Sequence, residues 1–275
     1  MEFLSKEKEL SCDILVVGAG PAGTGAALTA AKAGMKVIVV DKKWAIGSPV
    51  ECGECLDLGL ATKFKVDIGR NILCLEQTGT VFRIGRELVV DNTTPLWQSI
   101  SINRRELDKH FATEASRAGA TIMAWSEATK VKTDGDFIQS VTVRTGNEEK
   151  TIFPKIVVAA DGTNTIIGKA QKRKQLSDFE VGRTISYEMT NLRLAEKNKV
   201  QMFLEKKVGI GYFYIIPKGR DTANIGMGRL GVKKAPLEEL NELLEMHPII
   251  SPQVKNASIL EIKTGETPII GPRLE

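Results

Sequence analysis

The stretch that decides the fold is Cys12-Asp-Ile-Leu-Val-Val-Gly-Ala-Gly-Pro-Ala-Gly23. It begins with a short apolar run rich in β-branched residues, which predicts a buried strand. Glycines at G-x-G-x-x-G spacing follow, and the alanine-rich segment 21–33 predicts a helix that ends at Gly34. A second apolar run at 36–40 completes a βαβ unit, whose two strands we expect to be parallel.

This glycine spacing between a strand and a helix is typical of a dinucleotide-binding turn. Gly18 would allow the tight turn, Gly20 would let the main chain approach a pyrophosphate, and Gly23 would let helix and strand pack closely. Pro21 suits the first helical turn, where Ala22 also lies and where free N–H groups and the helix dipole favour phosphates. The alternative interpretation is a glycine turn without a ligand.

An acidic residue stands where the second strand ends. Asp41 lies close to the expected distance of about 20 residues from the glycines, and its carboxylate can accept hydrogen bonds from ribose hydroxyls. An acid at this position disfavours a 2′-phosphate, and Lys42 beside it is a further candidate for cofactor binding. An aspartate occupied by an internal partner would count against this assignment.

The remaining chain alternates between segments of the nucleotide-binding domain and antiparallel strands of a second domain. Residues 46–59 are rich in Gly, Pro and Cys and predict a functional loop. The alternation over 71–102 predicts short antiparallel strands inserted into the nucleotide-binding domain. That domain resumes with a helix at 105–118 and strands at 120–131, 137–143, 151–153 and 156–160. Beyond about residue 168 we expect antiparallel strands at 184–190, 200–204, 211–216 and 222–229, then a helix at 237–246.

Composition excludes several classes of protein. With 42% hydrophobic and 26% charged residues the chain is neither collagen-like nor disordered. The net charge of +4 is too small and too dispersed to indicate nucleic-acid binding. Apolar runs are far shorter than the roughly 20 residues of a membrane span, and residues 1–10 do not resemble a secretory signal. We therefore expect a cytoplasmic protein, and leave peripheral contact with the inner face of the membrane open.

The cysteines are too few for a disulfide framework, so reduced thiols are expected. They are Cys12, Cys52, Cys55 and Cys74. Cys52 and Cys55 have C-x-x-C spacing, but no second pair and no nearby histidine completes a tetrahedral set, so we predict no metal site.

The chain resembles the geranylgeranyl reductase family of FAD-dependent oxidoreductases, particularly the archaeal digeranylgeranylglycerophospholipid reductases. The resemblance covers nearly the whole chain, and the loop at 47–54 is its most specific part. It rests on the motifs Asp13–Gly23, Ile46–Cys55, Asn103–Asp108, Gly211–Pro217 and Ala223–Gly228. It implies an α/β fold with a Rossmann-type FAD-binding domain, 1–69 and 99–170, and an inserted antiparallel β-sheet substrate domain, 70–98 and 171–275.

The resemblance also implies which residues contact FAD. Those that match family positions are Ala22, Asp41, Cys52, Gly53, Arg104 and, through its main chain near the adenine, Ala128. Cys55 would also contact FAD, although the family prefers glycine there, which is one departure. Arg104, Asp161 and Gly162 stand where related two-domain flavoproteins place additional cofactor contacts. The alternatives are a surface role for Arg104, with Arg105 as the relevant residue, and an ordinary turn role for Asp161.

The implied activity is reduction of C=C bonds in geranylgeranyl chains of archaeal isoprenoid lipids. Candidate catalytic residues are Cys52, whose thiol could donate a proton or simply pack, and Tyr212 and Tyr214. The family pattern Tyr-x-Trp-x-Phe-Pro is replaced here by Tyr212-Phe-Tyr-Ile-Ile-Pro217, so the substrate could differ in length or head group. The implied partners are a prenylated lipid or another large apolar substrate, and NAD(P)H or a ferredoxin-like electron donor.

Two other functions are compatible with the same sequence. One is an FAD-dependent aromatic hydroxylase or halogenase, which is a monooxygenase; the other is a non-catalytic flavin protein that relays electrons. The segment 264–275 resembles the strand and turn that precede the family's Gly-Asp FAD motif, and Leu274-Glu275 resembles a cloning remnant. The expectation from that resemblance is a chain truncated before the motif, and therefore weak retention of FAD.

Overall fold

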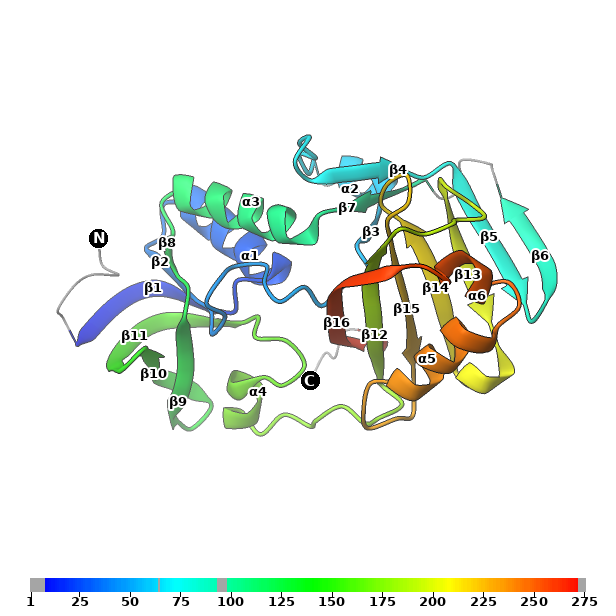
Figure 1. Ribbon diagram of the computed structural model, residues 1–275. Coiled ribbons are helices and arrows are strands. Elements are labelled where there is room, and N and C mark those ends of the chain that lie inside the picture. The colour runs from blue at the N-terminus through cyan, green and yellow to red at the C-terminus, as the bar shows by residue number, and fades with distance from the viewer. Residues whose placement is uncertain (1–7, 64, 93–97, 272–275) are drawn as a thin grey trace. The chain divides into compact units, whose positions relative to one another are not determined.

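The computed structural model describes residues 8–63, 65–92 and 98–271, and the chain forms two compact units (Figure 1). Unit 1 contains residues 1–49 and 105–175, and unit 2 contains residues 50–104 and 176–275. Segments 50–69 and 99–104 thus belong to unit 2, whereas the sequence assigned them to the nucleotide-binding domain. The physical reason is that Ser99–Ile102 pairs with Leu73–Glu76 of the inserted segment, and Cys55–Asp57 pairs in turn with Ser99–Ile102. The pair Leu274-Glu275 lies outside the described residues.

Unit 1 is built on a six-stranded sheet in the order β8-β2-β1-β11-β10-β9. The first four of these strands are parallel, as the βαβ pattern predicted, and β11-β10-β9 form an antiparallel hairpin extension. The strands are β1 (Glu9–Val17), β2 (Val37–Val40), β8 (Thr121–Met123), β9 (Ser126–Asp134), β10 (Phe137–Thr145) and β11 (Glu148–Ala159).

Both faces of the parallel strands are buried, which explains their continuous apolar runs. On one face, Val16 and Val39 pack with alanines of α1 (Pro21–Lys32) and α3 (Arg104–Arg117). On the other face, Leu15 and Ile38 pack with residues of the hairpin and of α4 (Ile166–Ala170). Small residues along α1 allow the helix to lie close to the strands, as the sequence pattern indicated.

Two strand predictions in unit 1 need correction. Segment 120–131 is two strands, because Trp125 adopts a left-handed φ of 52° and its N–H donates to the Lys43 carbonyl oxygen. Segments 151–153 and 156–160 are one strand, β11, because β1 pairs with it in register from Thr151 to Ala159 past Pro154. Pairing with the long parallel strand β1 thus keeps β11 continuous, although Pro154 predicts a break.

Unit 2 contains a seven-stranded sheet in the order β16-β12-β15-β14-β13-β5-β6. All neighbouring strands are antiparallel except β13 and β5. The strands are β5 (Gly79–Ile84), β6 (Glu87–Asn92), β12 (Val181–Thr190), β13 (Lys199–Leu204), β14 (Gly211–Pro217), β15 (Ala223–Arg229) and β16 (Ser258–Pro268).

One face of this sheet is covered by helices of the same unit (Figure 1). Leu240 and Leu243 of α5 (Leu237–Met246) pack with Phe213, Ile225 and other inward residues of the strands. The helix α6 (Ser251–Val254) and the 3-10 helix η3 (Lys206–Val208) complete this side. The alternate side chains of the strands point to the opposite face, which carries the candidate site.

A three-stranded antiparallel sheet in the order β3-β7-β4 belongs to the same unit. Its strands are β3 (Cys55–Asp57), β7 (Ser99–Ile102) and β4 (Leu73–Glu76), and α2 (Leu58–Lys63) follows β3. The short antiparallel strands expected over 71–102 are thereby confirmed. Among the residues that the structure describes, no helix combines the length and apolarity needed to span a membrane.

Candidate functional site

The turn between β1 and α1 places main-chain N–H groups beside open space. A Cβ at Gly18, whose φ is 104°, would lie 2.1 Å from the Ala160 carbonyl oxygen. The left-handed φ of Gly18 fits the tight turn expected there, and a Cβ at Gly23 would lie 1.8 Å from the Gly18 carbonyl oxygen, which fits the close packing expected of Gly23. A Cβ at Gly20 meets no described atom within 4 Å, and no described side chain caps α1. This geometry fits a pyrophosphate bound by the free N–H groups of the first helical turn.

The Asp41 carboxylate already has two main-chain partners. Its Oδ2 accepts a hydrogen bond from the Ala19 N–H at 2.7 Å, and its Oδ1 accepts one from the Lys43 N–H at 2.8 Å. The expectation of a carboxylate without internal partners is therefore corrected. Each carboxylate oxygen has about two acceptor positions, so one on each remains for a sugar hydroxyl. The two bonds fix the carboxylate beside the glycine turn, and its contact with a ribose stays a prediction.

Asp161 holds the beginning of a short helix. Its Oδ2 accepts hydrogen bonds from the N–H groups of Ile166 at 2.7 Å and Ile167 at 3.5 Å, in the first turn of α4. These bonds support the alternative interpretation of Asp161 as a structural turn residue. A direct contact between this carboxylate and a cofactor remains untested.

Three further candidate residues for cofactor binding lie in unit 1. Gly162 has a left-handed φ of 80°, which favours glycine. Lys42 has an exposed side chain, and Ala128 is half-buried in β9, where it pairs with Val143 of β10. Their contacts with a cofactor stay predictions.

In unit 2, the loop of residues 50–55 lies against the face of the large sheet that the helices leave open. A Cβ at Gly53 would lie 3.2 Å from the Tyr214 hydroxyl oxygen and 3.3 Å from Cδ1 of Ile216. The Gly53 carbonyl oxygen accepts a hydrogen bond from Nδ2 of Asn224 at 3.0 Å. The missing side chain at Gly53 thus permits the loop to approach β14 closely.

Glu54, in the same loop, is the centre of a buried ionic network. Its Oε2 accepts hydrogen bonds from Nζ of Lys263 at 2.5 Å, Nζ of Lys218 at 2.7 Å and Nδ2 of Asn224 at 2.8 Å. Both lysines also donate to Oε2 of Glu188 at 2.8 Å. Two ammonium groups are therefore balanced by two hydrogen-bonded carboxylates, and Oε2 of Glu261 lies 3.7 Å from Nζ of Lys263. Such pairing is the condition for burying charges.

The network keeps its carboxylates ionised. Burial alone would raise the pKa of Glu54, but the hydrogen bonds from Lys218 and Lys263 outweigh it and lower the pKa from 4.5 to about 2. The same opposing causes lower the pKa of Glu188. At neutral pH both carboxylates therefore act as fixed negative charges and not as proton donors.

Glu54 also connects the loop to neighbouring chain segments. Its Oε1 accepts a hydrogen bond from the Arg104 N–H at 2.8 Å, and its carbonyl oxygen accepts one from the Ile102 N–H at 3.0 Å. Its own N–H donates to Sγ of Cys52 at 3.2 Å. The main chain of Arg104 thus helps to hold this loop, whereas contact between Arg104 and a cofactor stays a prediction.

Cys52 and Cys55 are half-buried free thiols. Burial raises the pKa of Cys55, and a hydrogen bond with Ser99 acts in the opposite direction. In the described part of the chain, no group of three or more His, Cys, Asp and Glu residues is arranged to hold a metal ion. The proposed chemistry of Cys52 and the cofactor contacts of both cysteines stay predictions.

Tyr212 and Tyr214 point to the sheet face on which the loop lies. Their ring centroids are 6.1 Å apart, and Tyr214 is 8% exposed whereas Tyr212 is 43% exposed. Burial raises the pKa of both hydroxyls, and at Tyr214 a hydrogen bond with Ser186 opposes this effect. Tyr214 forms an apolar cluster with Val200, Ile216, Cys55 and Met202. The structure therefore brings both tyrosines together with Cys52, Gly53 and Cys55 in unit 2.

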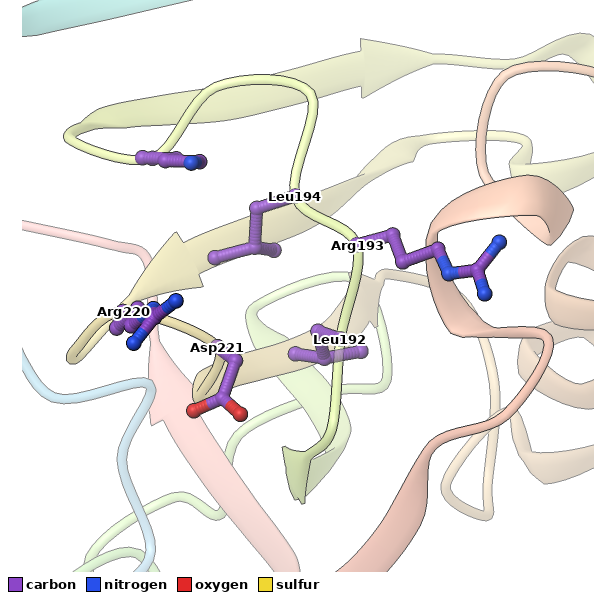
Figure 2. Close-up of a pocket in the computed structure, with 6 residues that line it drawn as sticks. Leu192, Arg193, Leu194, Arg220 and Asp221 are labelled. Atoms are coloured by element: carbon purple, nitrogen blue, oxygen red, sulfur yellow. The ribbon is translucent and has the colours of Figure 1, made fainter.

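A separate hollow of unit 2, with a volume of about 480 Å³, shares no residue with this cluster. Figure 2 shows Arg193 extending away from Leu194, whereas Arg220 and Asp221 lie on the opposite side of the view. Because these charged side chains do not converge, we assign no ligand to the hollow. Its lining residues are Leu192, Arg193, Leu194, Lys197, Arg220 and Asp221.

Sequence reasoning missed most of the ionic network. Glu54 counted only as a spacer between two cysteines, although it is 1% exposed. Of the other members, Asn224 lies in the quoted motif Ala223–Gly228 without a role assigned to it, and the remaining three lie outside the quoted motifs: Glu188, Lys218 and Lys263. The one available signal is a charged residue at an inward position of a strand, and it can be recognised only once the register is known.

Comparison with known proteins gives consistent results for both units. Residues 13–173 match the model of the family described as FAD dependent oxidoreductase, and residues 180–267 match the geranylgeranyl reductase catalytic domain. The digeranylgeranylglycerophospholipid reductase of Methanocaldococcus jannaschii is 35% identical over 267 residues, which cover 94% of this chain and 66% of that protein. Digeranylgeranylglycerophospholipid reductase 2 of Methanosphaera stadtmanae is 35% identical over 280 residues, with coverage of 95% and 67%.

Solved structures agree with this assignment. A geranylgeranyl bacteriochlorophyll reductase-like protein from Thermoplasma acidophilum has a TM-score of 0.84 at 27% identity, covering 95% of this chain and 67% of that one. A flavin-dependent brominase, with a TM-score of 0.72 at 18% identity, shares the fold alone. The chain spans about two thirds of the length of the relatives it matches. It belongs to the FAD dependent oxidoreductases, within the geranylgeranyl reductase family.

Proposed function

We propose that this protein reduces C=C bonds in the geranylgeranyl chains of isoprenoid lipids, with FAD as its cofactor. The observation that carries the proposal is the match of residues 180–267 to the geranylgeranyl reductase catalytic domain. That segment forms most of the sheet that presents Tyr212, Tyr214 and their apolar neighbours. An apolar surface with a few polar groups suits a long prenyl chain.

FAD, when bound, supplies hydride transfer, and the chain supplies binding, orientation and electrostatics. The N–H groups of the first turn of α1 bind the pyrophosphate, and Asp41 binds the ribose through its remaining acceptor positions. In unit 2, the cluster of Tyr214, Val200 and Ile216 keeps water away from a bound double bond.

Reduction of a C=C bond adds two hydrogens, one of which enters as a proton. We assign that proton to the Cys52 thiol, because Cys52 stands in the loop that packs on Tyr214. Tyr214 keeps its hydroxyl proton at neutral pH, since burial raises its pKa, and it serves to shape the surface and to position the loop. Glu54 and Glu188 are excluded as donors because they remain ionised.

The proposal includes two kinds of partner. The reducing equivalents come from NAD(P)H or from a ferredoxin-like protein, since the redox chemistry needs an external donor. The lipid substrate brings the protein to the inner face of a membrane as a peripheral partner. The electron donor and the membrane contact each need their own test.

The proposal can be tested by anaerobic turnover. The FAD-loaded protein would be reduced with dithionite and mixed with a geranylgeranyl glycerophospholipid, and the lipid would be analysed by mass spectrometry. We expect a gain of two hydrogens for each reduced double bond. Oxygen-dependent consumption of NAD(P)H with a hydroxylated or halogenated product would instead favour a monooxygenase. Flavin reoxidised only by another protein, with every lipid unchanged, would favour an electron relay.

A further inference from the structure

The loop that carries Cys52 contributes one side chain, that of Glu54, with several hydrogen bonds to the large sheet of unit 2. The Glu54 carboxylate receives donors from Lys218, which follows β14, from Asn224 of β15 and from Lys263 of β16. Its second oxygen binds the Arg104 N–H at the beginning of α3. The loop is therefore held at four separate places by a group whose side chain is 2% exposed.

The same contacts hold Glu54 in an unusual backbone conformation. Its φ is 63°, in the left-handed region that non-glycine residues rarely occupy unless the surroundings enforce it. In this conformation the Glu54 N–H donates to Sγ of Cys52 at 3.2 Å. The position of the carboxylate is thus linked directly to the orientation of the thiol.

Glu188 provides an internal comparison. It accepts a hydrogen bond of 2.8 Å from each of the same two lysines, so it also balances their charge. It lies on β12, and no contact with the loop is found for its side chain in the described part of the chain. Charge balance and attachment of the loop can therefore be separated experimentally.

We propose that Glu54 is a positioning residue that fixes the loop of residues 50–55 and thereby the exposure and orientation of the Cys52 thiol. Its carboxylate acts through the two lysines and Asn224 on one side and through the Arg104 N–H on the other. The role of Cys52 as a proton donor rests on the proposed function, whereas the role of Glu54 in fixing the loop does not. The position of the thiol itself can be measured without substrate or FAD.

The experiment compares alkylation by iodoacetamide, residue by residue, in Glu54→Gln and Glu188→Gln. Both substitutions remove one negative charge from the same lysines, but only Glu54 holds the loop. We expect the alkylation rate of Cys52 to rise roughly tenfold in Glu54→Gln, because the rate follows the population of the open loop. It should change less than about twofold in Glu188→Gln. Cys12, buried in β1, reports whether unit 1 is intact, and hydrogen exchange of the β14 and β15 amides reports whether unit 2 is intact.

A pair of charge-balanced variants keeps the test decisive if Glu54→Gln fails to fold. Glu54→Gln/Lys263→Met and Glu188→Gln/Lys263→Met each leave Lys218 with one of its two carboxylate partners, and only the second retains the attachment through Glu54. Faster alkylation of Cys52 in the first alone supports the proposal. Equal rates in both double variants, or an unchanged Cys52 rate in a folded Glu54→Gln, would overturn it.

A second readout comes from turnover in the reductase assay. If Glu54 positions the thiol, Glu54→Gln should lower kcat roughly tenfold with KM within about twofold, because the interaction matters in the transition state. A KM effect alone would contradict the role. Inactivity of the unsubstituted protein would count against the proposed function and would leave the alkylation comparison valid.

Discussion

Two glycines of α1 show how differently a methyl group can act at neighbouring positions. A Cβ at Gly23 would collide with the Gly18 carbonyl oxygen, whereas a Cβ at Gly25 meets no described atom within 4 Å. We expect Gly23→Ala to destabilise unit 1 by roughly 3 kcal/mol through overpacking. Gly25→Ala should stabilise it by about 0.5–1 kcal/mol, because alanine loses less backbone entropy in a helix. Hydrogen exchange of the β1 and β2 amides would measure both changes.

Binding of FAD should also be sensitive to a methyl group at Gly23 and insensitive to one at Gly25. Gly23→Ala moves the first turn of α1 away from β1 and should weaken FAD binding, which flavin fluorescence titration would detect. Gly25→Ala is the matched control and should leave the affinity unchanged. An equal loss of FAD affinity in both variants would mean that the collision at Gly23 does not determine the conformation of the turn.

The ionisation of Glu54 gives a stability that depends on pH in a defined window. Its pKa of about 2 in the folded protein lies below its usual value of 4.5, so folding favours the ionised form. The contribution is complete above about pH 4.5 and is lost as the pH falls toward about 2. Its size is on the order of 3 kcal/mol, reduced by any coupling to the other charges.

Hydrogen exchange of the β14 and β15 amides between these pH values would test this prediction. The local free energy of opening should fall with decreasing pH in the natural sequence. In Glu54→Gln this component should be absent, because the side chain can no longer titrate. A Glu54→Gln variant with the full pH dependence would show that another carboxylate is responsible.

At the scale of elements, α5 secures one face of the sheet in unit 2. Leu240 is fully buried among sheet residues, whereas Leu237, at the beginning of the same helix, is 44% exposed. We expect Leu240→Ala to cost about 2–5 kcal/mol of unfolding free energy, from lost burial and a remaining cavity. Leu237→Ala should change it by less than about 0.5 kcal/mol. Chemical denaturation followed by circular dichroism would compare them, and similar losses would contradict the packing.

The prediction of elements succeeded where a segment carries its own periodic pattern. The βαβ unit and the helix at 237–246 were found because their apolar spacing is set locally. The helices α2, α4 and α6 were missed, since each is shorter than two turns and shows no periodicity. The break before Trp125 and the continuity through Pro154 depend on partner strands, which local patterns do not identify.

At the scale of the whole molecule, the net charge of +4 predicts only weak attraction to anionic membranes. We expect measurable sedimentation with phosphatidylglycerol vesicles at about 0.02 M salt and its loss at about 0.15 M, where charges beyond about 8 Å are screened. Phosphatidylcholine vesicles are the control and should bind little at either concentration. Binding that persists at the higher salt would require an apolar contact.

The two units show which features can be predicted from sequence. Features built from neighbouring residues can be predicted, whereas the boundary between the units cannot. The position of Asp41 beside the glycine turn was predictable because residues close in sequence build this turn from one strand and one helix, whereas its contact with a ribose stays a prediction. The segment 50–69 was assigned to the wrong neighbours from sequence alone, since its strand partner β7 lies more than forty positions further along the chain. Because β7 also pairs with β4 of the inserted segment, β3 and β7 both lie in unit 2.

The sequence by itself determined the βαβ unit and its glycine turn, because both depend on local spacing. Only the tertiary structure decided that Glu54 is buried between Lys218 and Lys263 and that Asp41 is partly occupied by main-chain donors. The physical reason is that a buried charge needs partners from several strands. Those partners meet only after the register of the sheet is fixed.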